Sequence, residues 1–330
     1  MRKLVFLILI SAFAWSFYWY QGKSTRQTAL TTWFDERNEA GWVADSTVTM
    51  RGYPNRLDAI IEGIDLADPI SGWAWSAPRF ELLQLSYKPN HIIAQWPETQ
   101  YIKTPYERIT INSTDLRASL IREDDNALNR ATLTADSLAL SSTAKWGATT
   151  NKMVLAIRKN EASPNTYDLG LDAKDVAPSN LVLRDLGLIG ALPATFSTFR
   201  ADAQITLTAP ISQASFENAA AKLQAVTLNE IQAVWGDLAL RATGSMDLDA
   251  MGYPTGKLTI RATNWEQMLD LAIQSGTVQD SEASAIRTAL KFASALTGNA
   301  SELELPLTFA DRKIRLGPIP LGDAPRISFP

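Results

Sequence analysis

The sequence contains no cysteine and only one histidine, His91. These absences exclude a disulfide framework, thiol catalysis and zinc-finger sites, together with any Ser-His-Asp or Cys-His arrangement that does not use His91. His91 follows a predicted turn, Lys88-Pro89-Asn90, so we expect it to be an exposed loop side chain. Basic residues are not in excess either, because 31 Lys and Arg stand against 35 Asp and Glu. Nucleic acid is therefore not an expected partner, since its binding needs a basic surface.

Catalytic and metal-binding motifs are equally scarce. Ser142 and Lys145 have the S-x-x-K spacing, but the companion motifs are missing and the segment has the pattern of a strand. The acidic run 123–126 lacks the ligand pattern of a calcium loop and is interpreted as a hairpin tip. Asp247 and Asp249 are interpreted as exposed carboxylates at a strand end. We expect no catalytic residue, no metal and no cofactor.

The N-terminus combines Met1-Arg2-Lys3 with an apolar run over 4–20, which as a helix would be about 25 Å long. Its end, 15–20, is aromatic in the way of a membrane-interface belt. The alternative is a signal peptide cleaved after Ala12-Phe13-Ala14. We favour an uncleaved anchor over 1–23, because cleavage there would leave a bare aromatic run at the mature terminus. Either interpretation exports the rest of the chain.

A short amphipathic helix is predicted over 24–42. Ser24 and Gln27 have capping-box spacing, and an apolar stripe that includes Trp33 and Phe34 continues until Gly41 stops it. This stripe could lie on lipid or dock on the following β-rich region, and we favour docking.

From Ala44 onward apolar residues alternate with polar ones and turn residues recur, which predicts an antiparallel meander. Two amphipathic helices follow late, one over 265–273 and one after Ser281, and a hairpin with its turn at 310–312 ends the chain. The predicted class is α+β and mainly antiparallel β, an elongated curved sheet or β-meander with one N-terminal membrane helix. No long linker interrupts 43–330, which is predicted to be a single exported domain.

Ten tryptophans are an unusual number for 330 residues. Trp73, Trp75 and Trp96 lie close to predicted turns. They either plug the open ends of a curved sheet or contact lipid or another apolar ligand with their rings. Trp73, Trp75 and Trp96 are the candidate ligand-binding residues.

Several short motifs together resemble one protein family. They are Gly52-Tyr53-Pro54 with Arg56, Trp75-Ser76-Ala77-Pro78, Ser86-Tyr87-Lys88-Pro89-Asn90, Gly256-Lys257-Leu258-Thr259-Ile260 with Asn264-Trp265, and the segment 316–322 with Pro325. The set resembles the domain of unknown function 2125 family over essentially the whole chain. The resemblance implies an alphaproteobacterial envelope protein and carries no catalytic residues with it. The stretch 244–256 is distantly similar to AsmA-like envelope proteins, β-rich proteins linked to lipid transport or outer-membrane homeostasis.

The functional hypothesis is a single-pass inner-membrane protein whose bulk lies in the periplasm and binds lipid or another amphiphile in envelope homeostasis or transport. The alternative is a structural or assembly factor that contacts another envelope protein through a sheet edge. A hydrolase comes third, because paired glycosidase carboxylates need no fixed spacing in the sequence.

Overall fold

The computed structural model describes residues 1–163, 165–179, 183–184, 192–218, 220–276, 278–297, 299, 301–317 and 319–327. The chain divides into two compact units. Unit 1 comprises Met1–Asp124 and Leu133–Ala144, and unit 2 comprises Asp125–Thr132 and Lys145–Pro330. The α+β class with mainly antiparallel strands is confirmed. The assignment of 43–330 to a single domain stays a prediction.

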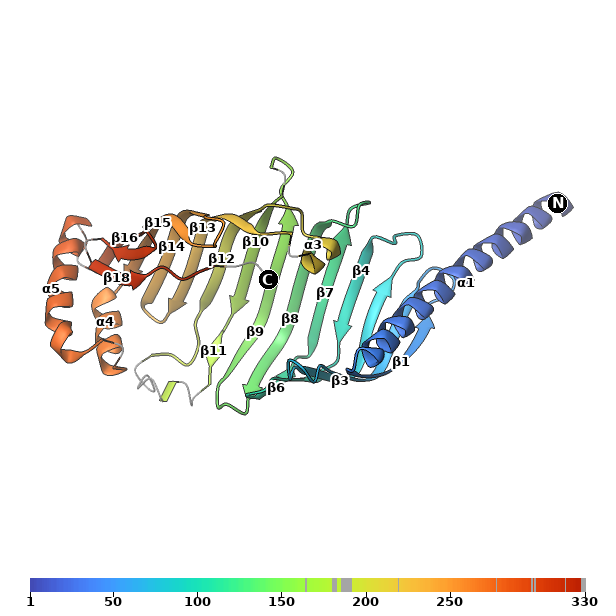
Figure 1. Ribbon diagram of the computed structural model, residues 1–330, viewed down its shortest axis with the longest axis horizontal. Helices are drawn as coiled ribbons and strands as arrows, with labels where there is room; N and C mark the ends of the chain where they lie inside the picture. Colours follow the sequence, from blue (N-terminus) through green and yellow to red (C-terminus); the bar gives the residue numbers. More distant parts are fainter. Residues whose placement is uncertain are drawn as a thin grey trace. The chain divides into compact units, whose positions relative to one another are not determined.

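The N-terminus forms one continuous helix, α1 (Arg2–Glu39). The separate helix start predicted at Ser24 is wrong, because a capping box acts only where the chain enters a helix from a non-helical conformation, and here the chain is already helical. The stop is confirmed, since Gly41 follows the helix with φ +87°. Figure 1 shows the N-terminal part of α1 extending away from the strands of unit 1.

Unit 1 is an antiparallel sheet in which one strand forks. Its strands are β1 (Val43–Arg51), β2 (Asp58–Ala67), β3 (Ala74–Gln84), β4 (His91–Trp96), β5 (Thr99–Lys103), β6 (Arg108–Asn112), β7 (Asp115–Arg122) and part of β8 (Leu128–Ser142). β2 pairs with β1 and β3, and the two halves of β3 pair with β5 and β4. β7 pairs with β4, β6 pairs with β5, and β8 pairs with β6.

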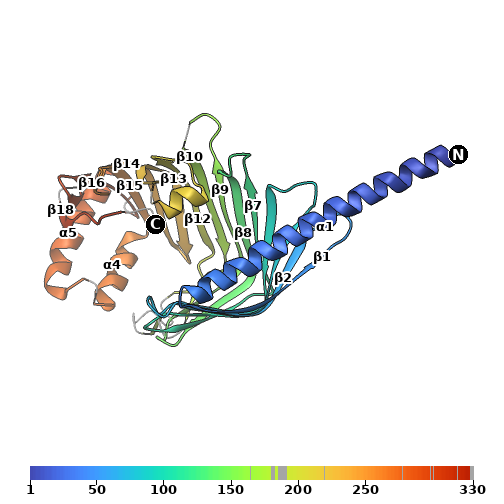
Figure 2. The same cartoon turned by 45° about the vertical axis from the view of Figure 1, so that its right-hand side comes forward.

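The core of unit 1 lies between the sheet and the C-terminal half of α1, which runs along these strands (Figure 2). Phe34 packs with Val48 and Ile61, and Trp19 packs with Met50 and other apolar residues of the sheet. The predicted docking of the amphipathic stripe on the β-rich region is therefore confirmed. Trp19 is only 9% exposed, so the folded unit begins inside the predicted anchor.

Unit 2 is an antiparallel meander in which each long strand pairs with the next (Figure 1). Its strands are β9 (Gly147–Lys159), β10 (Thr166–Lys174), β11 (Ala177–Pro178), β12 (Thr198–Leu207), β13 (Leu223–Trp235), β14 (Leu238–Leu248), β15 (Pro254–Thr263), β16 (Glu302–Ala310), β17 (Lys313–Leu316) and β18 (Ile319–Asp323). The predicted terminal hairpin is confirmed between β16 and β17, where Asp311 and Arg312 both have positive φ.

In the described part of this unit, the sheet is accompanied by α3 (Gln213–Glu217), α4 (Trp265–Gln274) and α5 (Asp280–Thr297). The two predicted late helices are α4 and α5. Their apolar stripes pack on β15 and β16, where Trp265 and Leu269 of α4 contact Leu303 and Leu305. Gly276 follows α4 with φ +73°, as its stop position requires.

One face of the unit 2 sheet is apolar along the whole meander. Residues directly opposite each other on neighbouring antiparallel strands point to the same face. Opposed positions on this face include Leu155, Ile157, Leu169, Leu171, Ala201, Ala203, Leu228, Ile231, Ala242 and Ile260. The helices α4 and α5 cover its β15–β16 end, and Ala324 near the C-terminus covers a second region around Met246 and Phe309.

Candidate functional site

Two of the three candidate tryptophans lie together in unit 1. Trp75 is on β3 and Trp96 ends β4, and Phe80 lies between them. The ring centroids of Trp75 and Phe80 are 5.5 Å apart, and those of Phe80 and Trp96 are 5.2 Å apart. Trp73 lies in the turn before β3 and is 56% exposed. A role of these residues in ligand binding stays a prediction.

The indole of Trp75 is part of the packing of unit 1. Its Nε1–H donates to Oε1 of Gln100 at 2.8 Å, and Gln100 is only 3% exposed. Trp75 also packs against the cluster that contains Phe34 and Val48. The indole N–H of Trp75 therefore does not face water, because a buried amide oxygen accepts its hydrogen bond.

A hollow with a mostly apolar lining lies in unit 2, between α4 and the ends of β13 and β14. Its volume is about 330 Å³, and its lining residues are Leu192, Phe196, Ala233, Trp235, Leu238, Leu240, Met268, Leu271, Ala272 and Ser275. Phe196 and Trp235 stack with centroids 4.2 Å apart, and the Trp235 indole donates to the carbonyl of Pro193 at 2.6 Å. The only polar side chain in the lining is Ser275, whose hydroxyl donates to the backbone of α4. This lining suits an apolar group.

The apolar sheet face continues from this hollow with several side chains in water. Leu240 is 42% exposed and lies opposite Ala233, which in turn lies opposite Phe199, 37% exposed. Leu155 on β9 belongs to the same face and is 44% exposed. The hollow is thus one end of a wider apolar surface that α4 and α5 leave partly uncovered.

The sequence patterns did not reveal this hollow. On β13, Val226 and Leu228 lie on the apolar face, and so do Ile231, Ala233 and Trp235. The first two have even numbers and the other three odd numbers, and in a regular strand even and odd positions point to opposite faces. A register shift between Leu228 and Ile231 causes this change. A bulge of this kind inserts residues into one strand and reverses the period-2 pattern beyond it. The signal available in the sequence was the shift of apolar residues from even to odd positions within this strand, which indicates a bulge.

The opposite face of unit 2 carries a hollow of about 470 Å³, with Gly170 among its lining residues. Arg158 pairs with Asp168 at 3.3 Å, and Arg200 pairs with Asp172 at 2.8 Å. Hydrogen bonds from the amides of Gln204 and Asn160, with help from Arg158, lower the pKa of Asp168. This face is therefore occupied by ion pairs and hydrogen bonds among its own side chains.

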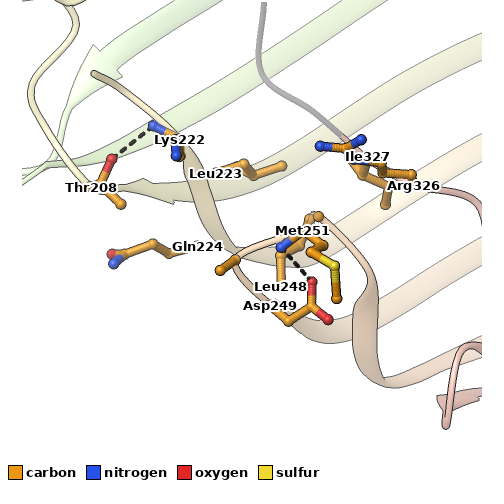
Figure 3. Close-up of a pocket in the computed structure, with 11 residues that line it drawn as sticks. Thr208, Lys222, Leu223, Gln224, Leu248, Asp249, Met251, Arg326 and Ile327 are labelled. Atoms are coloured by element: carbon orange, nitrogen blue, oxygen red, sulfur yellow. Dashed lines mark hydrogen bonds between the residues drawn. The ribbon is translucent and has the colours of Figure 1, made fainter. Parts of the chain in front are cut away.

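A third hollow, of about 420 Å³, lies beside the turn between β14 and β15 (Figure 3). Lys222, Arg326 and Asp249 are among its lining residues. Oδ1 of Asp249 accepts the backbone N–H groups of Met251 and Tyr253 at 2.8 and 2.9 Å. These bonds, that of Tyr253 first, lower the pKa of Asp249. Asp249 thus holds the turn, and its interpretation as an exposed strand-end carboxylate is confirmed.

The remaining chemical candidates have structural partners. The expectation for His91 is wrong, since it begins β4 half-buried and its Nε2 lies 2.9 Å from Oγ of Ser119. The hydroxyl of Ser142 donates to the carboxylate of Glu107. The strand assignment at Lys145 is also wrong, because this residue lies in the bend after β8 with φ +71°.

The acidic run 123–126 lies between β7 and β8, as the hairpin-tip interpretation requires. Within the described residues, no group of three or more His, Asp or Glu side chains is arranged to hold a metal ion. The expectations of no metal, no cofactor and no catalytic residue stay predictions.

The fold and its surfaces define a class: a β-sheet protein with one apolar sheet face and one long N-terminal helix. Over an 18-residue window that helix has a mean hydropathy of 1.5, enough by length and composition to cross a membrane. A family described as an uncharacterized protein conserved in bacteria (DUF2125) matches residues 19–325, and the chain belongs to this family. No curated protein and no solved structure gives a significant match.

Proposed function

We propose that this protein is a single-pass inner-membrane protein whose β-rich part lies in the periplasm and binds the apolar chain of a lipid or similar amphiphile. The supporting observation is the hollow between α4 and the β13–β14 face, about 330 Å³ in volume and apolar on nearly all sides. Small-molecule sites commonly have volumes of about 300–1,000 Å³. The hollow thus suits part of an acyl chain, with the rest on the neighbouring apolar face.

The energetics of this surface favour an apolar ligand. Each methylene group that leaves water contributes about 0.8 kcal/mol, so five or six methylenes would contribute about 4–5 kcal/mol before the costs of association. The exposed Leu240 and Phe199 would lose water contact at the same time. Large apolar patches left in water are typical of surfaces that bind a partner or a ligand.

The N-terminal helix supports the membrane location. Apolar side chains of its first part are exposed, for example Leu4 at 63% and Phe13 at 74%. Placing Arg2 and Lys3 in the cytoplasm agrees with the positive-inside tendency, and the aromatic residues after Ala14 would then lie at the outer interface. Alkaline phosphatase fused after Gly41 should be active, and an inactive fusion of a stably expressed chain would contradict the periplasmic location.

The ligand test uses the full-length chain, because Trp19 and Phe34 of α1 belong to the core of unit 1. Material that co-purifies in a lipid-free detergent would be extracted and identified by mass spectrometry. Ala272→Phe places a ring in the hollow and should remove most of the bound amphiphile. The control Ala289→Phe adds the same ring at an exposed position of α5 and should leave binding unchanged.

If the Ala272→Phe and Ala289→Phe proteins retain equal amounts of bound lipid, the ligand binds outside the hollow. Absence of lipid from the wild type, together with failure to take up a fluorescent fatty acid, would replace this proposal by the assembly-factor hypothesis. That second hypothesis predicts instead a protein partner cross-linked to a sheet edge.

A further inference from the structure

We propose that one edge of unit 1, formed by the turn 52–56 and the loop 86–90, enters the outer interface of the bilayer. We name it the membrane edge. The proposal rests on the membrane insertion of α1 given above and is independent of lipid binding by unit 2. It assigns a surface and its partner, the headgroup and glycerol region of the membrane that α1 would cross.

Hydrogen bonds fix the membrane edge to α1. The indole N–H of Trp15 donates to the carbonyl of Pro54 at 2.9 Å, and that of Trp19 donates to the carbonyl of Arg56 at 2.6 Å. The Tyr18 hydroxyl donates to the carbonyl of Ser86 at 3.0 Å. Both membrane-edge segments are therefore attached to the helix within residues 15–19.

The two segments are also bonded to each other. The backbone N–H and the hydroxyl of Ser86 both donate to the carbonyl of Asn55, at 2.9 and 3.0 Å. Ser86 is only 2% exposed, and Tyr53 adds an edge-on ring contact to Trp19 at 5.3 Å. A displacement of the membrane edge away from α1 would break several of these contacts together.

The length of α1 before its first hydrogen bond to the sheet determines how far the membrane edge lies from the inner membrane interface. From Arg2 to Trp15 an α-helix rises about 20 Å, whereas the hydrocarbon core of a bilayer is about 30 Å thick. The helix before its first bond to the sheet is thus about 10 Å too short to cross that core alone. With Arg2 and Lys3 at the inner interface, the turn 52–56 is therefore held at or below the outer boundary between headgroups and acyl chains.

The composition of the membrane edge fits this depth. Each segment presents one exposed tyrosine, Tyr53 at 59% and Tyr87 at 57%. Neither segment contains Asp or Glu, and Lys88 supplies a cation, whereas Arg56 is ion-paired with Asp58 at 2.8 Å. Tyrosines are enriched where membranes meet water, and cations are attracted to anionic headgroups.

The opposite end of the same strands supplies a control. β2 runs from Asp58 to Ala67, so its far end lies about 30 Å from the membrane edge. The far loops belong to the same unit and contain Tyr106, which is 94% exposed. Tyr106 should stay in water whether or not the membrane edge meets lipid.

The test uses nitroxide labels on single cysteines, since the chain has none of its own. Tyr87→Cys, Asn55→Cys and the control Tyr106→Cys are made in the full-length chain and reconstituted in phosphatidylcholine–phosphatidylglycerol vesicles. At positions 55 and 87, collisions with a water-soluble nickel complex should be several-fold fewer than at 106, and collisions with oxygen more frequent. Equal, solvent-like values at all three positions in a carbonate-resistant protein would overturn the proposal.

A second variant tests the length argument directly. Seven apolar residues inserted between Leu9 and Ile10 lengthen the helix by about 10 Å and rotate its faces by only about 20°. Nickel access at 55 and 87 should then rise towards the value at 106. Unchanged access would overturn the proposal while leaving the anchor intact, whereas release of the wild type by carbonate would overturn both.

Discussion

The hydrogen bond between Trp75 and Gln100 allows a sharp test of whether Trp75 is a structural residue. Trp75→Phe keeps an aromatic ring on β3 but removes the indole donor, so Oε1 of Gln100 loses this donor although Gln100 is only 3% exposed. A buried polar group without its partner costs about 1–3 kcal/mol. The smaller ring loses about 1 kcal/mol of apolar burial. The variant should therefore lower the free energy of unfolding of unit 1 by about 2–4 kcal/mol.

A double-mutant cycle isolates the hydrogen-bond contribution. Trp75→Phe with Gln100→Leu removes donor and acceptor together, so the double variant should be more stable than the sum of the single effects by about 1–2 kcal/mol. Trp73→Phe is the control, because Trp73 is 56% exposed and such substitutions usually change stability by less than about 0.5 kcal/mol.

The assay is hydrogen exchange by mass spectrometry on the full-length chain in detergent, with the free energy of opening taken from peptides of β3 and β5. Additivity of the single variants within about 0.3 kcal/mol would refute this account of the bond. The same samples test ligand binding by Trp75. A folded Trp75→Phe protein that keeps its lipid assigns the residue to the core, whereas selective loss of lipid supports a role at the ligand.

Three further predictions concern the two units. Gly252→Ala should destabilise unit 2 more than Gly276→Ala, as measured by thermal unfolding. Both glycines have positive φ, but a Cβ at Gly252 would lie 2.4 Å from a backbone oxygen of the C-terminal segment and one at Gly276 meets nothing within 4 Å. Asp168→Asn should weaken the loss of stability in acid. The native pKa of Asp168 is lowered by its amide partners, so its contribution is complete above its unfolded pKa, about 4, and is lost as the pH falls through the lower native value. His91→Ala and Ser142→Ala should each leave cellular function intact in a complementation assay, and selective loss of function in a folded variant would contradict the prediction that neither is catalytic.

The sequence predicted the parts of the fold that follow a simple period. Apolar and polar residues alternate regularly in β6, β7, β10 and β14, and helical spacing located α4 and α5. The turn that contains Gly252 connects β14 to β15, and Gly252 has the positive φ that such a turn favours. These elements are set by local chemistry, so short stretches of sequence contain enough information to place them.

The parts that depend on long-range pairing were not predictable in this way. The bulge in β13 reverses the alternation, so a strict period of two does not place Trp235 on the same face as Val226 and Leu228, although it lines the apolar hollow. His91 was predicted to be a loop residue because its strand pairs with β7, where its partner Ile121 lies 30 residues further along. The helix continues through Ser24 because Trp19 and Phe34 both pack on the same sheet, and tertiary packing outweighs a local capping signal.

The fate of the N-terminus is the last prediction. The small residues Ala12 and Ala14 satisfy the cleavage rule, but the structure places them inside α1, where the Ser16 hydroxyl donates to the carbonyl of Ala12 at 2.7 Å. Cleavage would need this turn of helix to open immediately before Trp15, which is bonded to Pro54. We therefore expect the mature protein to keep Met1 or Arg2 and to resist carbonate extraction. Intact-mass spectrometry checks this directly. A variant with Ala12 and Ala14 replaced by leucine serves as a non-cleavable control, and it should migrate on a denaturing gel like the wild-type protein. A mature terminus at Trp15 would refute the anchor while leaving the hydrogen bonds of Trp15, Tyr18 and Trp19 in place, and the protein would then be released from the membrane.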